Sequence, residues 1–239
     1  MNVYRILFLW VLLAKGTLAQ TVDHSLSDAN FISYTVNPRE AKLKLYWKDD
    51  TGHILGSIKN LKSYVESKKA HLIFAMNGGM YKADQSPQGL FIKDRMTLSP
   101  IDTASGKGNF YLKPNGIFYI SKDGRATICE TQSFRPESVS YATQSGPMLV
   151  CDSEINTAFK KGSENLNIRN GVGILPDGRL IFAISKVKVN FYDFAMYFKN
   201  LGCRDALYLD GFVSRMYLPE QGWEQQDGNF GVLIGVVDK

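Results

Sequence analysis

The chain has 239 residues, 44% of them hydrophobic and 21% charged, a composition typical of a globular protein that can bury a core. Its formal net charge is +5 at pH 7, and without the two positive charges of Arg5 and Lys15, which lie in the N-terminal segment described next, it is +3. Because this charge is small and Lys and Arg form no dense block, the sequence predicts no nucleic-acid partner. We find no internal repeat or low-complexity segment, which favours one domain.

The first 19 residues have the features of a secretory signal peptide. Arg5 precedes an apolar run at residues 6–14, and Thr17-Leu18-Ala19 resembles a small-residue cleavage site. A membrane-spanning helix needs about 20 apolar residues, and Lys15 interrupts this run too early. We therefore expect a domain from about residue 20 to 239 that is secreted or periplasmic, with no membrane span after cleavage.

The expected domain contains three cysteines, Cys129, Cys151 and Cys203. None has the spacing of a metal site, and with three histidines in the chain a zinc site is not expected. One disulfide with a free thiol and three buried thiols both remain open. No cofactor is predicted, and a requirement for a divalent cation is left open.

Short strands with turn residues between them are predicted along most of the chain. In the second of these, Lys42, Lys44 and Tyr46 alternate with apolar residues, which is the pattern of a half-buried strand. The predicted strands are residues 31–36, 43–47, 71–76, 89–92, 115–120, 126–129, 148–150, 172–175, 180–184, 207–209 and 231–237.

Two helices are predicted between these strands. Residues 57–69 have apolar residues at helical spacing, with Ser57 as the N-cap. The second helix begins after Asn190, which forms a capping box with Asp193, and ends at Gly202. Because strands and helices do not alternate regularly, we predict an α+β fold: a single domain of many short strands in a mixed sheet with a few packed helices.

The first of four polar segments follows the strand at residues 71–76. Asn77, Gly78 and Gly79 are predicted to form a turn whose backbone N–H groups make a nest for an anionic oxygen, with the Asn77 amide as a further donor. An ordinary hairpin turn is the alternative. The polar stretch at residues 82–88 argues against it, because it delays the partner strand.

The second polar segment contains Gln144, Ser145 and Gly146, followed by a proline. It is predicted to be a loop that presents polar groups to a ligand. A nucleophilic role for Ser145 is not favoured, because the G-x-S-x-G motif is absent and no neighbouring base is evident.

Arg169 defines the third segment, directly before Asn170-Gly171 and a predicted hairpin. It is either a surface charge or a fork for a carboxylate or phosphate, and its place beside a glycine turn favours the fork.

Asp210 defines the fourth segment, at the end of a buried strand and before Gly211, Ser214 and Arg215. A carboxylate held in this way can face a cleft. The alternative is that Asp210 only caps an Asp-Gly turn.

Taken in order, the four segments resemble the motifs of the phosphodiester glycosidase family. Residues 77–81 are similar to its NGG-plus-aromatic segment, 144–150 to its SGP-x-L segment, 169–174 to its arginine-led GxG strand and 205–214 to its DAL-x-LDGG-x-S ending. The chain departs from the family pattern at Phe212, where a glycine is lost, at Asn170, where threonine is usual, and at Arg215, where a small polar residue is usual.

The resemblance implies a hydrolase that cleaves the glycosidic C1–O bond of a sugar-1-phosphodiester and releases the sugar and a phosphomonoester. It implies catalytic roles for Asp210, Arg169 and Asn77, with Asp210 stabilising an oxocarbenium-like centre or activating water, and Arg169 holding the phosphate. The expected substrate-binding residues are Gly78, Gly79, Tyr81, Gln144, Ser145, Gly146, Asn170, Gly211, Ser214 and Arg215. No second carboxylate lies inside a motif, so the stereochemical outcome is open.

Two alternatives to this function remain. One is a non-catalytic glycan- or phosphoglycan-binding protein of the cell envelope, which would use the same cleft without turnover. The other is an enzyme that cleaves the P–O bond, which usually needs a metal cluster.

Overall fold

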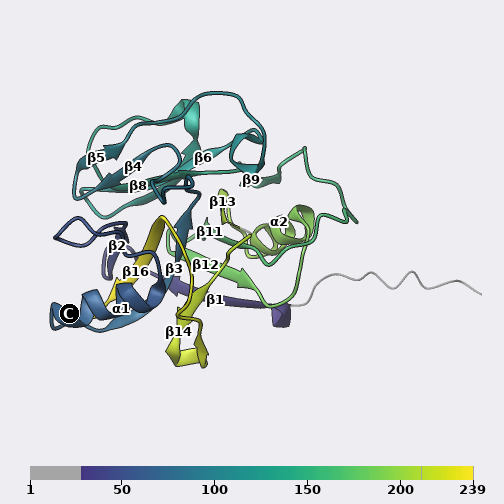
Figure 1. Ribbon diagram of the computed structural model, residues 1–239. Helices are drawn as coiled ribbons and strands as arrows, with labels where there is room; N and C mark the ends of the chain where they lie inside the picture. The colour runs from purple at the N-terminus through teal and green to yellow at the C-terminus, as the bar shows by residue number, and fades with distance from the viewer. Residues whose placement is uncertain (1–27, 211, 239) are drawn as a thin grey trace, which may run out of the picture.

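The structure, a computed structural model, describes residues 28–210 and 212–238 (Figure 1). The predicted signal peptide, residues 1–19, and Gly211 therefore lie outside the described residues. Three sheets and two α-helices make up this part of the chain, and each strand pairing in it is antiparallel. The prediction of many short strands with few helices is confirmed, whereas the prediction of a mixed sheet is wrong and the fold is mainly β.

The first sheet contains the strands on both sides of Arg169 and the strand that carries Asp210. Strands β12 and β13 are buried along their whole length, which is why they appear in the sequence as continuous apolar runs. Its strands, in spatial order, are β1 (Phe31–Val36), β12 (Leu180–Ser185), β11 (Asn170–Ile174), β13 (Ala206–Asp210), β9 (Met148–Cys151) and β10 (Glu154–Ile155).

The second sheet has β3 at its centre and β2 at its edge. Exposed lysines alternate with buried leucines along β2, as the sequence pattern predicts. Its strands, in spatial order, are β15 (Trp223–Glu224), β14 (Met216–Leu218), β3 (Leu72–Gly79), β16 (Val232–Val237) and β2 (Lys42–Tyr46).

The third sheet lies above the other two in Figure 1, and in it the predicted strands at residues 115–120 and 126–129 are confirmed and form a hairpin. Its strands, in spatial order, are β5 (Met96–Ser99), β4 (Phe91–Lys93), β8 (Val139–Ser145), β6 (Gly116–Ser121) and β7 (Ala126–Glu130).

Both helices begin at the predicted N-caps. Helix α1 (Ile58–Ser67) follows Ser57, whose Oγ accepts a hydrogen bond from Asn60 N at 3.1 Å, and it packs on β3. Helix α2 (Phe191–Asn200) follows Asn190 and covers β9 and β10. Neither helix is long and apolar enough to span a membrane.

One hydrophobic core joins the three sheets. Phe182 of the first sheet contacts Phe74 of the second and Phe118 of the third, with ring centroids 5.1 and 6.1 Å apart. The three cysteines are free thiols in the structure. Because the sheets share this core, the ends of their strands are held in fixed positions relative to one another.

Candidate functional site

The ends of β3, β11, β13 and β14 meet where the first sheet packs against the second. Asn170 at the start of β11 lies opposite Asp210 at the end of β13. Met216, the first residue of β14, lies opposite Met76 of β3. Because the two strands are antiparallel, Arg215, directly before β14, lies next to Asn77, which follows Met76. Three of the four polar segments are thus brought together by strand pairing.

Two irregularities in strand pairing lie at this place. Asn77 pairs with Leu233 and Gly79 with Val232, so Gly78 is an extra residue in β3. Asn170 pairs with Asp210 and Gly171 with Tyr208, so one residue of β13 is likewise unmatched. Such β-bulges turn side chains away from the regular alternation, and here they lie next to Asn77 and Asp210.

The Asn170 side chain links the segments. Its Nδ2 donates to Asn77 O and to Asn77 Oδ1, both at 2.9 Å, and its Oδ1 accepts from Asp210 N at 2.8 Å. The side chain is 0% exposed, so these bonds form without competition from solvent. Asn170, predicted to bind substrate, is placed by the structure where it orients Asn77 and Asp210.

The Asn77 amide has a defined orientation. Its Oδ1 accepts from Asn170 Nδ2 and from Arg215 N, at 2.9 Å each, so the oxygen and nitrogen of the amide cannot be exchanged. Its Nδ2 is the one buried side-chain N or O atom of the described residues that has no hydrogen-bond partner. An unsatisfied donor of this kind normally costs about 1–3 kcal/mol.

Asp210 is 8% exposed, and its backbone is fixed on both sides. Ser214 Oγ donates to Asp210 O at 2.7 Å, and Ser145 Oγ donates to Leu209 O at 2.9 Å. Both serines, predicted to bind substrate, therefore hold the strand end that carries the carboxylate.

Tyr81 and Phe212 lie near this carboxylate. Burial raises the pKa of Tyr81, and the charge of Asp210 raises it further, which places the two side chains within electrostatic range. Phe212 N donates to Asp210 Oδ1 at 3.2 Å, while the Phe212 side chain is 93% exposed. The departure from the LDGG pattern thus puts an exposed aromatic ring two residues from Asp210.

Arg169 is 0% exposed, and its guanidinium is bonded to the protein. Nε donates to Val189 O at 2.9 Å, Nη2 to Asn165 O at 2.8 Å and Nη1 to Tyr208 Oη at 3.2 Å. Its Cζ lies 3.7 Å from the centroid of the Phe191 ring. Burial lowers the pKa of Arg169, and within the described residues it forms no ion pair. The fork predicted for a phosphate is thus used to fix the start of β11.

Gly78 and Gly79 are part of strand β3, so the predicted turn and its nest are wrong. A Cβ at Gly78 would lie 2.4 Å from Ile234 Cγ1, and one at Gly79 would lie 2.5 Å from Thr143 Oγ1. Glycine is needed here for close packing of neighbouring chain segments rather than for a concave turn.

Gln144 and Ser145 lie in strand β8, so the predicted loop begins only at Gly146. The Gln144 Oε1 accepts from Leu90 N and Asp102 N, and its Nε2 donates to Asp102 O at 2.6 Å. Its hydrogen-bonding capacity is used to fasten the segment around Asp102. At Gly146 a Cβ would lie 2.6 Å from Asn115 Cβ, so this glycine too permits close packing.

Two residues of this region were not predicted. Asp227 accepts from Arg215 Nε at 2.8 Å, which holds Arg215 at the rim of the site and raises its pKa. Tyr208, one of the buried residues of β13, contacts Arg169. Asp227 lies in an irregular polar stretch and Tyr208 in an apolar run, so neither has a local signal that marks it.

Metal binding has no built site in this part of the chain. Within residues 28–210 and 212–238, no group of three or more His, Cys, Asp and Glu side chains is placed to hold a metal ion. The polar groups of the candidate site are therefore the Asp210 carboxylate, the Asn77 Nδ2 donor and the Arg215 side chain.

Comparison with known families identifies the class of protein to which this fold and site belong. Residues 70–232 match the family model of phosphodiester glycosidases, and the chain belongs to this family. It is 35% identical over 243 residues to protein YigE of Escherichia coli K12, itself described as uncharacterized, and the match covers all of this chain and 94% of that protein.

Solved structures share the fold. The zebrafish N-acetylglucosamine-1-phosphodiester alpha-N-acetylglucosaminidase catalytic domain, auto-inhibited by its pro-peptide, has a TM-score of 0.60 and 15% identity, covering 90% of this chain and 86% of that one. A hypothetical protein from Synechocystis has a TM-score of 0.58 and 14% identity, covering 87% of this chain and 59% of that one. At these identities the likeness concerns the fold alone.

Proposed function

We propose that this protein is a hydrolase that acts outside the cytoplasm and cleaves the C1–O bond of a sugar-1-phosphodiester, releasing the sugar and a phosphomonoester. Membership of the phosphodiester glycosidase family supports the reaction class. The observation that carries the proposal is the buried Asn77 Nδ2, which has no partner within the described residues and lies in the cluster that fixes Asp210.

Cleavage of the C1–O bond develops positive charge on the sugar and negative charge on the leaving oxygen. In the proposal, Asp210 stabilises the positive charge or activates the attacking water. A phosphate monoester is a good leaving group, so donors that bind its oxygens matter more than a strong acid. In the proposal Asn77 Nδ2 becomes such a donor once the groups that cover it move aside, and Arg215, which pairs with Asp227, lies beside it.

Hydrolysis in oxygen-18 water tests the proposal directly. The protein is incubated with a panel of sugar-1-phosphodiesters, and the products are analysed by mass spectrometry. Label in the released sugar is expected, because water then attacks C1. Label in the phosphate would instead identify a phosphodiesterase and contradict the proposal.

Variants test the assigned residues. Asp210→Asn is expected to lower kcat at least a hundredfold, and Asn77→Ala to lower kcat/KM about a hundredfold or more, the range for removing one donor at a developing charge. Asp177→Asn, an exposed carboxylate in the β11–β12 turn that pairs with Arg179, is the matched control. Turnover by Asp210→Asn at the wild-type rate would remove Asp210 from the mechanism. Sugar-phosphodiester binding without product from any substrate would favour the glycan-binding alternative.

A further inference from the structure

A hollow of about 190 Å³ opens at the end of β3 opposite to the candidate site. Ala70, just before β3, lines it, whereas Asn77 is near the other end of the strand. Seven residues of extended strand separate the two places by roughly 20 Å at about 3.3 Å per residue. The other lining residues are Lys44, Tyr46, Asp50, Tyr64, Val65, Lys68, Lys93, Asp94 and Val237, and we call this place the Tyr46 hollow.

The hydroxyl of Tyr46 is an unused donor at this hollow. Tyr46 is 5% exposed, and its hydroxyl has no hydrogen-bond partner within the described residues. The hydroxyl oxygen is not completely buried, because among the described residues the completely buried side-chain atom without a partner is Asn77 Nδ2. Tyr46 is one of the residues that line the hollow. Burial, with smaller contributions from Tyr64 and Asp94, raises the pKa of Tyr46, so its proton stays available for donation.

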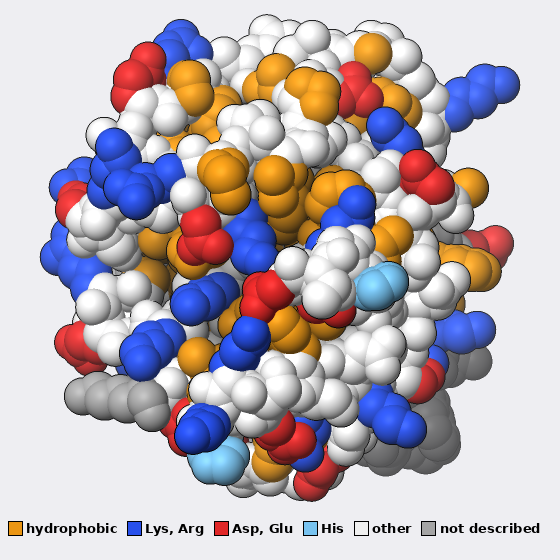
Figure 2. Space-filling view, turned by 60° about the vertical axis from the view of Figure 1, so that its left-hand side comes forward, with side chains coloured by type: hydrophobic (Ala, Val, Ile, Leu, Met, Phe, Trp, Pro, Cys, Tyr) orange, Lys and Arg blue, Asp and Glu red, His pale blue; other side chains and the backbone are white. Residues whose placement is uncertain are grey.

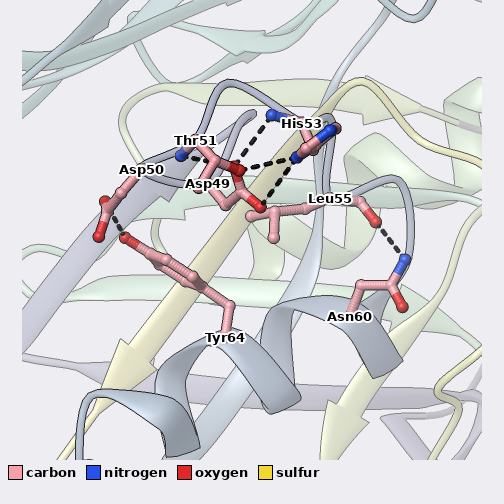
Figure 3. Close-up of polar contacts among 7 residues, drawn as sticks. All are labelled: Asp49, Asp50, Thr51, His53, Leu55, Asn60 and Tyr64. Carbon is pink, nitrogen blue, oxygen red and sulfur yellow. Dashed lines mark hydrogen bonds and ion pairs between the residues drawn. The ribbon is translucent and has the colours of Figure 1, made fainter.

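The charges at the hollow leave an excess of positive charge. Three lysines and two aspartates line it, and the aspartates are already bonded. Asp50 accepts from Tyr64 Oη at 2.6 Å and pairs with Lys68, and Asp94 accepts from Tyr141 Oη at 2.5 Å. Figure 3 shows Tyr64 reaching from α1 to Asp50, and Figure 2 shows a face on which Lys and Arg side chains gather with Asp and Glu between them.

Two of the lysines are free to bind a ligand. Within the described residues, the ammonium groups of Lys44 and Lys93 form no ion pair or hydrogen bond. Lys44 comes from the edge strand β2 and Lys93 from the end of β4, so they approach the hollow from two different sheets. Positive charge from two sides, with a hydroxyl donor in the same lining, matches a compact oxyanion.

The β4–β5 turn that positions Lys93 is held in an unusual conformation. Asp94 and Arg95 both have positive φ, at 50° and 71°, in a hairpin where asparagine and glycine are usual. Arg95 N donates to Ser140 O at 3.0 Å, and Tyr141 holds the Asp94 carboxylate. The wall of the hollow is therefore fixed by contacts rather than left to a flexible loop.

We propose that the Tyr46 hollow is a phosphate-binding site, separate from the candidate catalytic site, in which Lys44, Lys93 and the Tyr46 hydroxyl bind the phosphate oxygens. Its volume corresponds to about six water molecules at roughly 30 Å³ each. This admits a phosphate group, and because the hollow is open to solvent, a phosphate monoester binds with its organic part toward solvent. The site does not depend on the proposed hydrolysis.

The site is tested by titrating the protein with inorganic phosphate at constant ionic strength and recording nitrogen–proton NMR spectra at each phosphate concentration. Saturable shifts are expected at the backbone of residues 44–46 and 93–94, apart from any shifts around Asn77. Tyr46→Phe removes only the hydroxyl, and Lys93→Gln removes one charge; each is expected to raise the Kd about tenfold, the lower end for a hydrogen bond to a charged group. A parallel titration with glycerol phosphate shows whether the free ion or the monoester binds better.

Lys42→Gln is the matched control, because Lys42 is an exposed lysine on the same face of β2 that does not line the hollow. It is expected to leave the Kd within a factor of two. The proposal is overturned if Tyr46→Phe binds phosphate as the wild type does, if Lys42→Gln weakens binding as much as Lys93→Gln, or if shifts at residues 44–46 rise linearly without saturation. Acetate binding as tightly as phosphate would also overturn it.

Discussion

Truncation of Asn170 gives the sharpest test of the amide cluster. Asn170→Ala removes the acceptor of Asp210 N, at 2.8 Å, and the donor to Asn77 O and Oδ1, at 2.9 Å each. Because Asn170 is 0% exposed, Asp210 N and Asn77 O lose their partners in a place that solvent does not reach. Each such group costs about 1–3 kcal/mol, so the free energy of unfolding should fall by about 2–6 kcal/mol. That is a large part of the usual total of 5–15 kcal/mol.

Urea unfolding followed by circular dichroism measures this loss, with an unchanged m-value as the sign that the two end states are preserved. Asn200→Ala is the control: Asn200 is exposed at the end of α2, and a change within about 0.5 kcal/mol is expected. Asn170→Thr should fall between, because one hydroxyl can replace part of the amide. An Asn170→Ala chain as stable as the Asn200→Ala chain would refute the assignment of Asn170 as the link between Asn77 and Asp210.

Two further predictions concern packing and pH. Gly78→Ala places a Cβ 2.4 Å from Ile234 Cγ1 and should lower the free energy of unfolding, measured in urea, by about 1–3 kcal/mol. The double variant with Ile234→Ala should lose less free energy of unfolding than the sum of the two single losses, because Ile234→Ala removes the clashing atom. Additive losses would contradict the packing explanation. Burial, and then the hydrogen bond to Asp50, raises the pKa of Tyr64 to about 12 from 10, so the folded chain keeps a proton there that the unfolded chain loses. This group should therefore leave the free energy of unfolding unchanged below pH 10 and lower it as the pH rises from 10 through about 12. The fall should be smaller in Tyr64→Phe, and equal falls in the two chains would contradict this assignment.

The regular elements could be predicted because their signals are local. Ser57 and Asn190 mark the helix starts, and the apolar runs at residues 180–184 and 207–209 mark buried strands. The pairing of these strands into three sheets could not be predicted, because long-range register depends on which faces meet in the core. The positions of most strands were therefore right in outline, and the mixed sheet was wrong.

The candidate site was predictable in part, because its residues lie at strand ends that a turn signal marks. Asn77, Asn170 and Asp210 are brought together as the order of the four segments indicates. The roles of the glycines were misjudged, because Gly-Gly in a sequence fits both a turn and a strand that another chain segment approaches closely. Only the position of Ile234, 156 residues after Gly78, distinguishes the two.

The free-energy cost of burying Arg169 can be related to the proposed function of the site. A buried guanidinium without a carboxylate is expensive, and here carbonyl oxygens, Tyr208 and the Phe191 ring offset only part of that cost. Besides burial, the charges of Arg169 and Asp210 both influence the pKa of Tyr208, so the cation lies close to the strand end that carries Asp210. In the proposed reaction the phosphate of the substrate supplies negative charge in this region without contacting Arg169. The buried cation then favours binding of a phosphodiester through its field, while Asn77 and Arg215 make the direct contacts.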